Sequence, residues 1–245
     1  MNYEYKTQVS DSFINSVILA LSGGLQDAYT YNVRSEVFAN AQTGNIVLMS
    51  QNLMSGKWTN AVEYIIPLIA FALGIFAAER FSYHLRTSNI LHWRQWVLII
   101  EMSILFAVGF LPHSMDLLAS AMVSLSCAMQ VQSFRKVNGY KYSSTMCIGN
   151  LRAGTEALSK YFREKSSESL ASSLHYFGII LTFAIGAGIG GLLSINLGIS
   201  AIWASCILLM ASTLLMFKEF HKVSFHYAFI FSKFLYSLSV LIFIW

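Results

Sequence analysis

Long apolar stretches separated by short polar ones dominate this chain. Several are close to the roughly 20 residues that a helix needs to cross a hydrocarbon core about 30 Å thick. The pattern therefore predicts an all-α, polytopic transmembrane bundle with the lipid bilayer as its main partner. The predicted spans are residues 12–32, 60–82, 94–111, 115–134, 172–194 and 197–217, with a seventh at 225–245.

The composition agrees with this pattern. Hydrophobic residues make up 56% of the 245 residues and charged residues only 11%, against roughly 25% charged in a soluble domain. The net charge of +4 does not indicate nucleic-acid binding, because the lysines and arginines lie at the ends of apolar stretches and form no basic stripe. We expect no nucleic-acid partner.

Two further segments, residues 37–54 and 142–161, are only partly apolar, and each is interrupted by a Gly-Asn pair. If both dip into the membrane and return to the side they came from, nearly all lysines and arginines fall on one face. Cytoplasmic loops are enriched in these residues. The charge pattern thus predicts two re-entrant half-helices and a cytoplasmic amino terminus. The four exceptions are Arg34, Lys57, Arg152 and Lys233.

The chain also contains an internal repeat. A shift of 105 residues aligns Asp27 with Gln132 and Gly44-Asn45 with Gly149-Asn150, and a shift of 112 aligns 71–74 with 183–186. Each half then holds three spans and one half-helix, and an odd number of spans inverts the second half, as in many secondary transporters. The predicted organisation is a cytoplasmic segment at 1–11, a first repeat at 12–111, an inverted second repeat at 112–217 and an extension at 218–245 with one further span.

Small residues recur at matching places in the two repeats. Gly74 and Ala78 lie four residues apart in one span, and Gly186 and Gly190 lie at the aligned positions of another. Small residues at this spacing let helix backbones approach closely in lipid. We therefore assign these four residues to helix packing.

The Gly-Asn pairs are the strongest candidates for a functional site. A half-helix that begins at residues 43–45 would place its free backbone N–H groups near the membrane centre, where they favour an anion or a carboxylate. Thr43 is expected to cap it, and Gly44 to permit the turn. In the alternative, Asn45 and Asn150 merely satisfy the backbone of a broken helix. The residues expected to bind a solute are Asp27, Asn40, Thr43, Gly44, Asn45, Gln132, Gly149 and Asn150.

Charged residues inside predicted helices form a second candidate group. Glu101 lies in the middle of one span, and an acid in a membrane is paired, protonated or facing a wet cavity. Arg152 is the candidate counter-charge for Glu101 or Asp27, so these residues would tune charge or couple an ion. A structural ion pair is the alternative. The glycine pair at 23–24 is expected to weaken or bend the first span.

Several of these residues resemble the YoaK family of bacterial membrane proteins. The resemblance lies in residues 23–29 (GGLQDAY) and 37–45 (VFANAQTGN), together with 129–132 and Gly149-Asn150. It covers about 12–217 and implies a domain of about six spans, of unknown function, in a bacterial inner membrane. Ile148 stands where the first copy has Thr43, which puts a cap at the second turn in doubt.

These observations predict a transporter or channel for a small polar or anionic solute. The open alternatives are a non-transporting scaffold or regulator, favoured by a dry interior with Asp27 locked to Arg152, and an enzyme that uses Asp27 or Glu101, favoured by an opening toward lipid. A polar cavity that reaches one face would favour transport. No nucleophile set, cofactor motif or metal-ligand spacing is visible, so we expect no enzyme, cofactor or metal. A second copy of the chain remains open as a partner.

Overall fold

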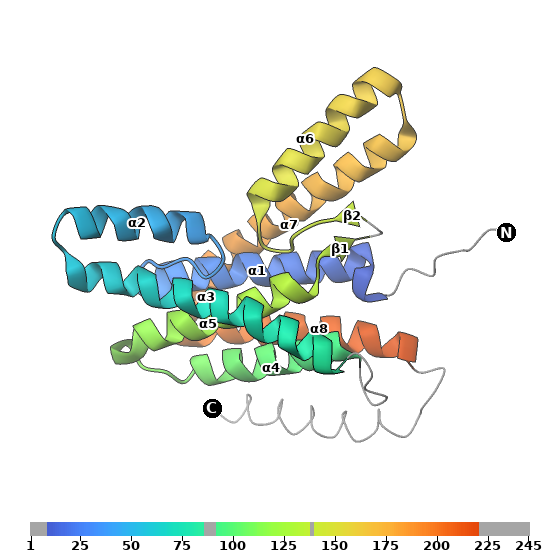
Figure 1. Ribbon diagram of the computed structural model, residues 1–245. Helices are drawn as coiled ribbons and strands as arrows, with labels where there is room; N and C mark the ends of the chain where they lie inside the picture. Colours follow the sequence, from blue (N-terminus) through green and yellow to red (C-terminus); the bar gives the residue numbers. More distant parts are fainter. Residues whose placement is uncertain (1–8, 86–91, 138–139, 221–245) are drawn as a thin grey trace.

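The computed structural model describes residues 9–85, 92–137 and 140–220, which form a bundle of long helices (Figure 1). The seventh span expected at 225–245 lies outside these residues. The first half of the chain contains η1 (Val9–Asp11), α1 (Phe13–Val33), α2 (Gln42–Met54), α3 (Trp58–Leu85) and α4 (Trp93–Val108). The second half contains η2 (His113–Met115), α5 (Asp116–Ser133), α6 (Cys147–Glu164), α7 (Ser167–Leu197), η3 (Gly198–Ile202) and α8 (Trp203–Phe220).

A short two-stranded ribbon, with two residues in each strand, departs from the expected all-α structure. Strand β1 (Lys136–Val137) pairs antiparallel with β2 (Tyr140–Lys141) in the link between α5 and α6. Helix ends follow ordinary capping chemistry. The Ser12 and Ser166 hydroxyls accept hydrogen bonds from the backbone N–H groups of Asn15 and Ser169, at 3.2 and 3.4 Å, which satisfies N–H groups that have no partner within the helix.

The two helices that carry the Gly-Asn pairs begin at aligned positions of the sequence. Helix α2 starts at Gln42 and α6 at Cys147, a spacing of 105 residues. Their lengths differ, because α2 has 13 residues and α6 has 18. At about 1.5 Å per residue, α6 is too long for a half-helix confined to half a bilayer. Its later turns carry exposed charged side chains, among them Glu156, Lys160 and Arg163.

The two halves pack against each other in a reciprocal way. Helix α1 lies along α7 and α5 along α3, while α4 contacts α5 and α8 contacts α1. Each broken helix covers its neighbour, α2 on α3 and α6 on α7. In Figure 1, α1 and α5 run in opposite directions, and so do α3 and α7. The largest apolar core joins α1, α4, α5 and α8 and contains Leu19, Leu105, Val123 and Leu209, all 0% exposed.

Glycines permit the closest of these contacts. A Cβ atom on Gly24 would lie 2.1 Å from the Phe183 carbonyl oxygen, and one on Gly186 would lie 2.2 Å from that of Leu21. Gly74 approaches the backbone of α5 and Gly190 that of α1 in the same way, and Ala78 is buried. Helix α1 runs without interruption through Gly23-Gly24. The glycines serve close packing, and the weakening or bend expected there stays a prediction.

Within the described residues, three stretches are long and apolar enough to cross a membrane, namely Trp58–Leu85, His113–Ser133 and Ser167–Phe217, the last of which includes both α7 and α8. The predicted spans at 12–32 and 94–111 correspond to α1 and α4 but are not among them. Helix α1 buries polar residues such as Asn15, Gln26 and Asp27, and α4 has only 16 residues. Both helices pack inside the bundle, where they need less apolar surface than a helix facing lipid.

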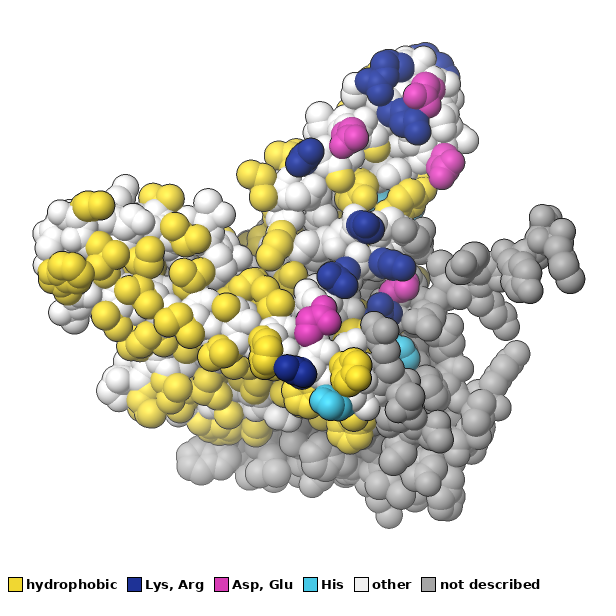
Figure 2. Space-filling model, in the orientation of Figure 1, with side chains coloured by type: hydrophobic (Ala, Val, Ile, Leu, Met, Phe, Trp, Pro, Cys, Tyr) yellow, Lys and Arg dark blue, Asp and Glu magenta, His cyan; other side chains and the backbone are white. Residues whose placement is uncertain are grey.

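The surface divides by residue type. Hydrophobic side chains cover α2 and α3 in the view of Figure 2, whereas lysine, arginine and acidic side chains gather around the tips of α6 and α7. Exposed apolar residues such as Ile69, Leu73 and Phe76 on α3 and Leu181 and Ile195 on α7 match a lipid-facing surface.

Candidate functional site

Helix α1 carries a line of buried polar side chains into the centre of the bundle. Ser22, Gln26, Asp27 and Thr30 are all at most 7% exposed. Buried polar groups cost free energy unless they are hydrogen-bonded. The partners of these side chains therefore define the interior chemistry of the protein.

The side chain of Gln26 makes three of the hydrogen bonds in this network. Its side-chain amide nitrogen donates to Ser22 Oγ at 3.0 Å and to Glu101 Oε1 at 3.2 Å. Its side-chain oxygen accepts a hydrogen bond from the Cys127 thiol at 2.6 Å. One amide thus connects α1, α4 and α5, although these residues lie far apart in the sequence.

Glu101 is completely buried, and its hydrogen-bond partner among the described residues is the neutral amide of Gln26. Its Oε2 atom has no hydrogen-bond partner within the described part of the chain. Gln26 binds its other oxygen, and the thiols of Cys127 and Cys206 lie within electrostatic range. An acid in such surroundings is a functional candidate, because an unpaired charge inside a membrane is costly.

Asp27 is buried in a different environment. Its Oδ1 accepts the backbone N–H of Asn40 at 2.7 Å, and the backbone of Ala39 and Ala41 provides further hydrogen bonds. These residues lead directly into α2, whose positive dipole end favours a carboxylate. Asp27 therefore has a structural role that Glu101 lacks, since it holds the start of the broken helix.

The segments that lead into the two broken helices meet at Gly23. Asn40 donates its side-chain amide to the Gly23 carbonyl at 3.4 Å, and a Cβ on Gly23 would lie 2.3 Å from Thr145 Cγ2. Asn40 and Thr145 are 105 residues apart, so they occupy matching places in the repeat. Asn40 Oδ1 and Thr145 Oγ1 are buried without a hydrogen-bond partner among the described residues. Both oxygens retain unused hydrogen-bonding capacity near Asp27.

Asn45 and Asn150 make the same pair of hydrogen bonds. The Asn45 side chain donates to the Phe38 carbonyl at 2.7 Å and accepts the Phe38 N–H at 3.1 Å. Asn150 does the same with Ser143, at 2.7 and 3.2 Å. In both cases the asparagine clamps the backbone seven residues earlier. This geometry matches the alternative in which these residues satisfy the backbone of a broken helix.

Three other residues of the Gly-Asn segments lie apart from this interior network. Thr43 is exposed and does not cap α2, because the N-cap position is Ala41, which makes no side-chain bond. Gly44 contacts the Phe38 ring, and Gly149 has open space around its Cα.

Gln132 and Arg152, two more of the predicted site residues, do not contact Asp27 or Glu101 through a hydrogen bond or ion pair among the described residues. Gln132 aligns with Asp27 but donates a hydrogen bond to Glu79. Arg152 is exposed on α6 and forms no ion pair within the described ranges. It therefore balances neither Asp27 nor Glu101 in this structure, because its side chain leaves the bundle.

Arg34 is buried, although the charge pattern predicted it in a loop on the side of the membrane opposite the cytoplasm. Its guanidinium donates to Asp116 Oδ1 at 2.7 Å, to the Tyr29 hydroxyl at 2.8 Å and to the carbonyls of Leu111 at 2.9 Å and Val108 at 3.0 Å. The side chain is 0% exposed. Arg34 thus ties the end of α1 to the α4–α5 turn. Its position just after an apolar stretch gave no signal of this role.

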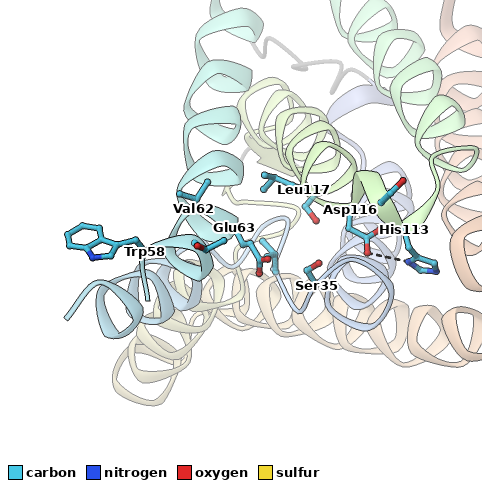
Figure 3. A pocket seen from close by; sticks show the side chains of 11 residues that line it. Ser35, Trp58, Val62, Glu63, His113, Asp116 and Leu117 are labelled. Atoms are coloured by element: carbon cyan, nitrogen blue, oxygen red, sulfur yellow. Dashed lines mark hydrogen bonds and ion pairs between the residues drawn. The ribbon is translucent and has the colours of Figure 1, made fainter. Parts of the chain in front are cut away.

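A pocket of about 540 Å³ opens beside this ion pair, and we call it the α3–α5 pocket (Figure 3). Glu63 and Trp58 from α3 line one side, His113 and Asp116 the other, and Ser35 lies between them. His113 Nδ1 lies 3.2 Å from Asp116 Oδ2. Asp116 is therefore paired twice, while Glu63 has no hydrogen-bond or ion-pair partner among the described residues. None of the residues that line the pocket is a lysine or arginine.

Comparison with known proteins shows the relationship of this chain. The model of a protein family described as "Protein of unknown function (DUF1275)" matches residues 16–215. The chain belongs to this family. It is also 23% identical over 202 residues to the UPF0700 transmembrane protein YoaK of Bacillus subtilis (strain 168), covering 78% of this chain and 88% of that protein. The resemblance predicted from the glycine and asparagine motifs is thus confirmed.

No solved structure matches the chain. Membership of the DUF1275 family, the transmembrane relative and the long apolar helices agree that this is a helical membrane protein.

Proposed function

We propose that this DUF1275 protein is a proton-coupled secondary transporter of a small polar solute. The observation that carries the proposal is Glu101, a fully buried acid between the two halves of the chain whose hydrogen-bond partner among the described residues is the neutral amide of Gln26. Such a group can take up and release a proton as its surroundings change. Its hydrogen bond to Gln26 links that event to α1, which packs along α7.

The proposed architecture is two inverted repeats. The matching starts of α2 and α6, the identical clamps of Asn45 and Asn150, and the reciprocal packing of α1 on α7 and α5 on α3 support it. The opposite directions of α1 and α5 in Figure 1 agree with inversion. Inverted repeats give a transporter two related conformations, one open to each side.

We further propose that the protein lies in the bacterial cytoplasmic membrane with its amino terminus inside and with α1 and α4 as additional spans. The basic residues around β1, β2 and the α6–α7 turn support this orientation. The α3–α5 pocket then opens on the outer face, since its lining comes from the end of the molecule where α1 ends and α3 and α5 begin.

The charge of the interior favours a neutral or cationic solute over the anion that the helix termini suggested. Asp27 already occupies the positive end of α2. Both buried acids lack a basic partner among the described residues, and Arg152 lies outside the bundle. An anion would therefore meet two acids and no compensating charge.

The two alternative functions have less support. A scaffold would be favoured by a dry interior in which Asp27 and Arg152 are locked together, whereas Arg152 is exposed. An enzyme would be favoured by an opening toward lipid with a nucleophile or metal set. Among the described residues no group of His, Cys, Asp and Glu side chains is placed to hold a metal ion. An open pocket at one face of the molecule, whose lining includes Glu63, His113 and Asp116, supports transport.

The test uses purified full-length protein in liposomes that contain a pH-sensitive dye. A panel of amino acids, amines, sugars and small carboxylates is added outside under an imposed proton gradient. We expect one class of neutral or cationic solutes to move protons across the membrane, with no response in empty liposomes. Folded protein that moves protons with no member of the panel would contradict the proposal.

A further inference from the structure

The repeat allows each end of the molecule to be compared with the other. A shift of 105 places Ser35 and Val37 of the α3–α5 pocket on Tyr140 and Tyr142, and a shift of 112 places Glu63 on His175. These three side chains thus correspond to two tyrosines and a histidine at the other end, while Trp58 of the pocket corresponds to Leu170. The two ends of the molecule are therefore lined differently at these positions.

The aromatic side chains pack together where α1, β2 and α7 meet, and Tyr140 and Tyr176 also line an open pocket of about 330 Å³ between α6 and α7. His175 packs edge-on against Phe13 with ring centroids 4.9 Å apart, and Tyr140 lies 5.8 Å from His175 and 6.4 Å from Tyr176. The Tyr176 hydroxyl donates to the Lys141 carbonyl at 2.8 Å, which fixes the ring over the β1–β2 ribbon. We call Phe13, Tyr140, His175 and Tyr176 the aromatic cluster.

Residues behind the aromatic cluster are sealed from solvent. Ala20 on α1 is 0% exposed and belongs to the same apolar group as Tyr142 and Tyr176. At the other end, the α3–α5 pocket of about 540 Å³ reaches the side chains of Val37 and Ser120, each only 1% exposed. The two halves therefore differ in a way that a closed, symmetric scaffold does not require.

The charges of the open pocket select among solutes. Asp116 is neutralised by Arg34 and contacts His113, so the carboxylate of Glu63 is left as the free charge of the lining. A cleft of one charge sign within low-dielectric walls concentrates ions of the opposite sign. Trp58 also lines the pocket, but its indole is 68% exposed and points away from Glu63 in Figure 3, so the charge preference rests on Glu63.

We propose that the α3–α5 pocket is the outer access site for a small cationic solute, such as an organic amine, and that the aromatic cluster closes the equivalent route to the cytoplasm in this conformation. This inference rests on the transport function and orientation proposed above. It adds the charge class of the solute and the conformation, which is open to the outside and closed to the inside.

The first test measures the charge preference of the pocket with thiol reagents that do not cross membranes. The native cysteines are removed as C127S, C147S and C206S, and Thr59→Cys introduces one thiol into the lining of the pocket. Intact spheroplasts that carry this variant are treated with a cationic or an anionic methanethiosulfonate. After normalisation to a thiol in solution, we expect the cationic reagent to react about tenfold faster. Glu63→Gln should bring the two rates together, while Glu164→Gln on exposed α6 should not. Equal rates, or a preference for the anion, would overturn the cationic assignment.

The second test measures closure on the cytoplasmic side in inverted vesicles. Ala20→Cys lies behind the aromatic cluster and should react far more slowly than Ala171→Cys, the repeat counterpart of Thr59 at this end. Tyr176→Ala should raise the Ala20→Cys rate several-fold, and Phe76→Ala on the lipid-facing surface should leave it unchanged. Rapid labelling of Ala20→Cys without the Tyr176 substitution would overturn the proposed closure.

Both labelling tests report independently of solute flux. If the predicted rates are found and no solute moves in liposomes, the access site and its closure stand and the transport function fails. If solute moves but the rates show no asymmetry, the transport function stands and this inference fails.

Discussion

The amide of Gln26 donates a hydrogen bond of 3.2 Å to the carboxylate of Glu101, and both side chains are 0% exposed. These residues come from α1 and α4, and Cys127 of α5 binds the same amide. Because no basic side chain shares this network within the described residues, the charge of Glu101 has no compensation. This relationship is the basis of the proposed proton coupling.

The two asparagine clamps should both contribute to stability, and Asn45 somewhat more, because its side chain also donates to Gln42 Oε1 at 3.0 Å. Asn45→Ala and Asn150→Ala each remove two hydrogen bonds to a bent backbone segment. We expect each to lower the free energy of unfolding by about 1–3 kcal/mol, seen as a lower thermal midpoint in detergent. Asn52→Ala, whose side chain bonds only a carbonyl four residues earlier on α2, is the control. A stable Asn45→Ala variant without transport would restore a direct role in solute binding.

Close contact between α1 and α7 makes Gly186 intolerant of a side chain. The Cβ of Gly186→Ala would meet the Leu21 carbonyl oxygen at 2.2 Å, so the helices must separate. We expect a loss of about 1–3 kcal/mol. Gly188→Ala, two residues along the same helix with open space around it, should change stability by less than about 0.5 kcal/mol. Equal thermal midpoints for the two variants would contradict the packing described here.

The buried ion pair at the end of α1 should be needed for folding. Asp116→Asn leaves the guanidinium of Arg34 buried without its counter-charge, and breaking such a pair costs about 3–5 kcal/mol. Lys160→Gln removes one member of an exposed pair on α6, which is worth at most about 1 kcal/mol. Chemical unfolding of both variants in detergent measures the difference. A small effect of Asp116→Asn would show that the Arg34 guanidinium finds sufficient partners in the backbone carbonyls.

The proposed orientation predicts that the α2–α3 and α6–α7 turns lie on opposite sides of the membrane. The three native cysteines are first replaced by serine. A single cysteine is then introduced at Lys57 or at Lys165, both of which are exposed. An impermeant thiol reagent should label Lys57→Cys in intact spheroplasts and Lys165→Cys only in inverted vesicles. Labelling of both from one side would rule out the inverted arrangement.

Much of the architecture could be predicted from the sequence because it depends on local pattern. The apolar stretches and the Gly-Asn pairs locate the long helices and the starts of α2 and α6 within a few residues. The repeat aligns Asn45 with Asn150, and the structure gives both the same hydrogen bonds. These features are encoded within segments of about 20 residues.

The partners of the buried polar groups could not be predicted, because they are decided by packing between distant segments. Gln26 lies beside Asp27 in the family motif, yet its contacts with Glu101 and Cys127 span 75 and 101 residues. Arg34 resembles an ordinary residue at the end of a span, and its burial depends on the α4–α5 turn. The contacts of the Gly23-Gly24 pair with α7 are likewise not visible in the sequence.

Glu101 is proposed to carry the coupled proton, and the Glu101→Gln variant in liposomes tests this role most directly. With a solute identified by the panel, we expect this variant to lose proton movement and uphill uptake by at least about 100-fold, yet to retain exchange of labelled for unlabelled solute. Glu164→Gln should behave like the unchanged protein. If Glu101→Gln still drives uphill uptake with a proton gradient at the normal rate, the proposed role of Glu101 is wrong.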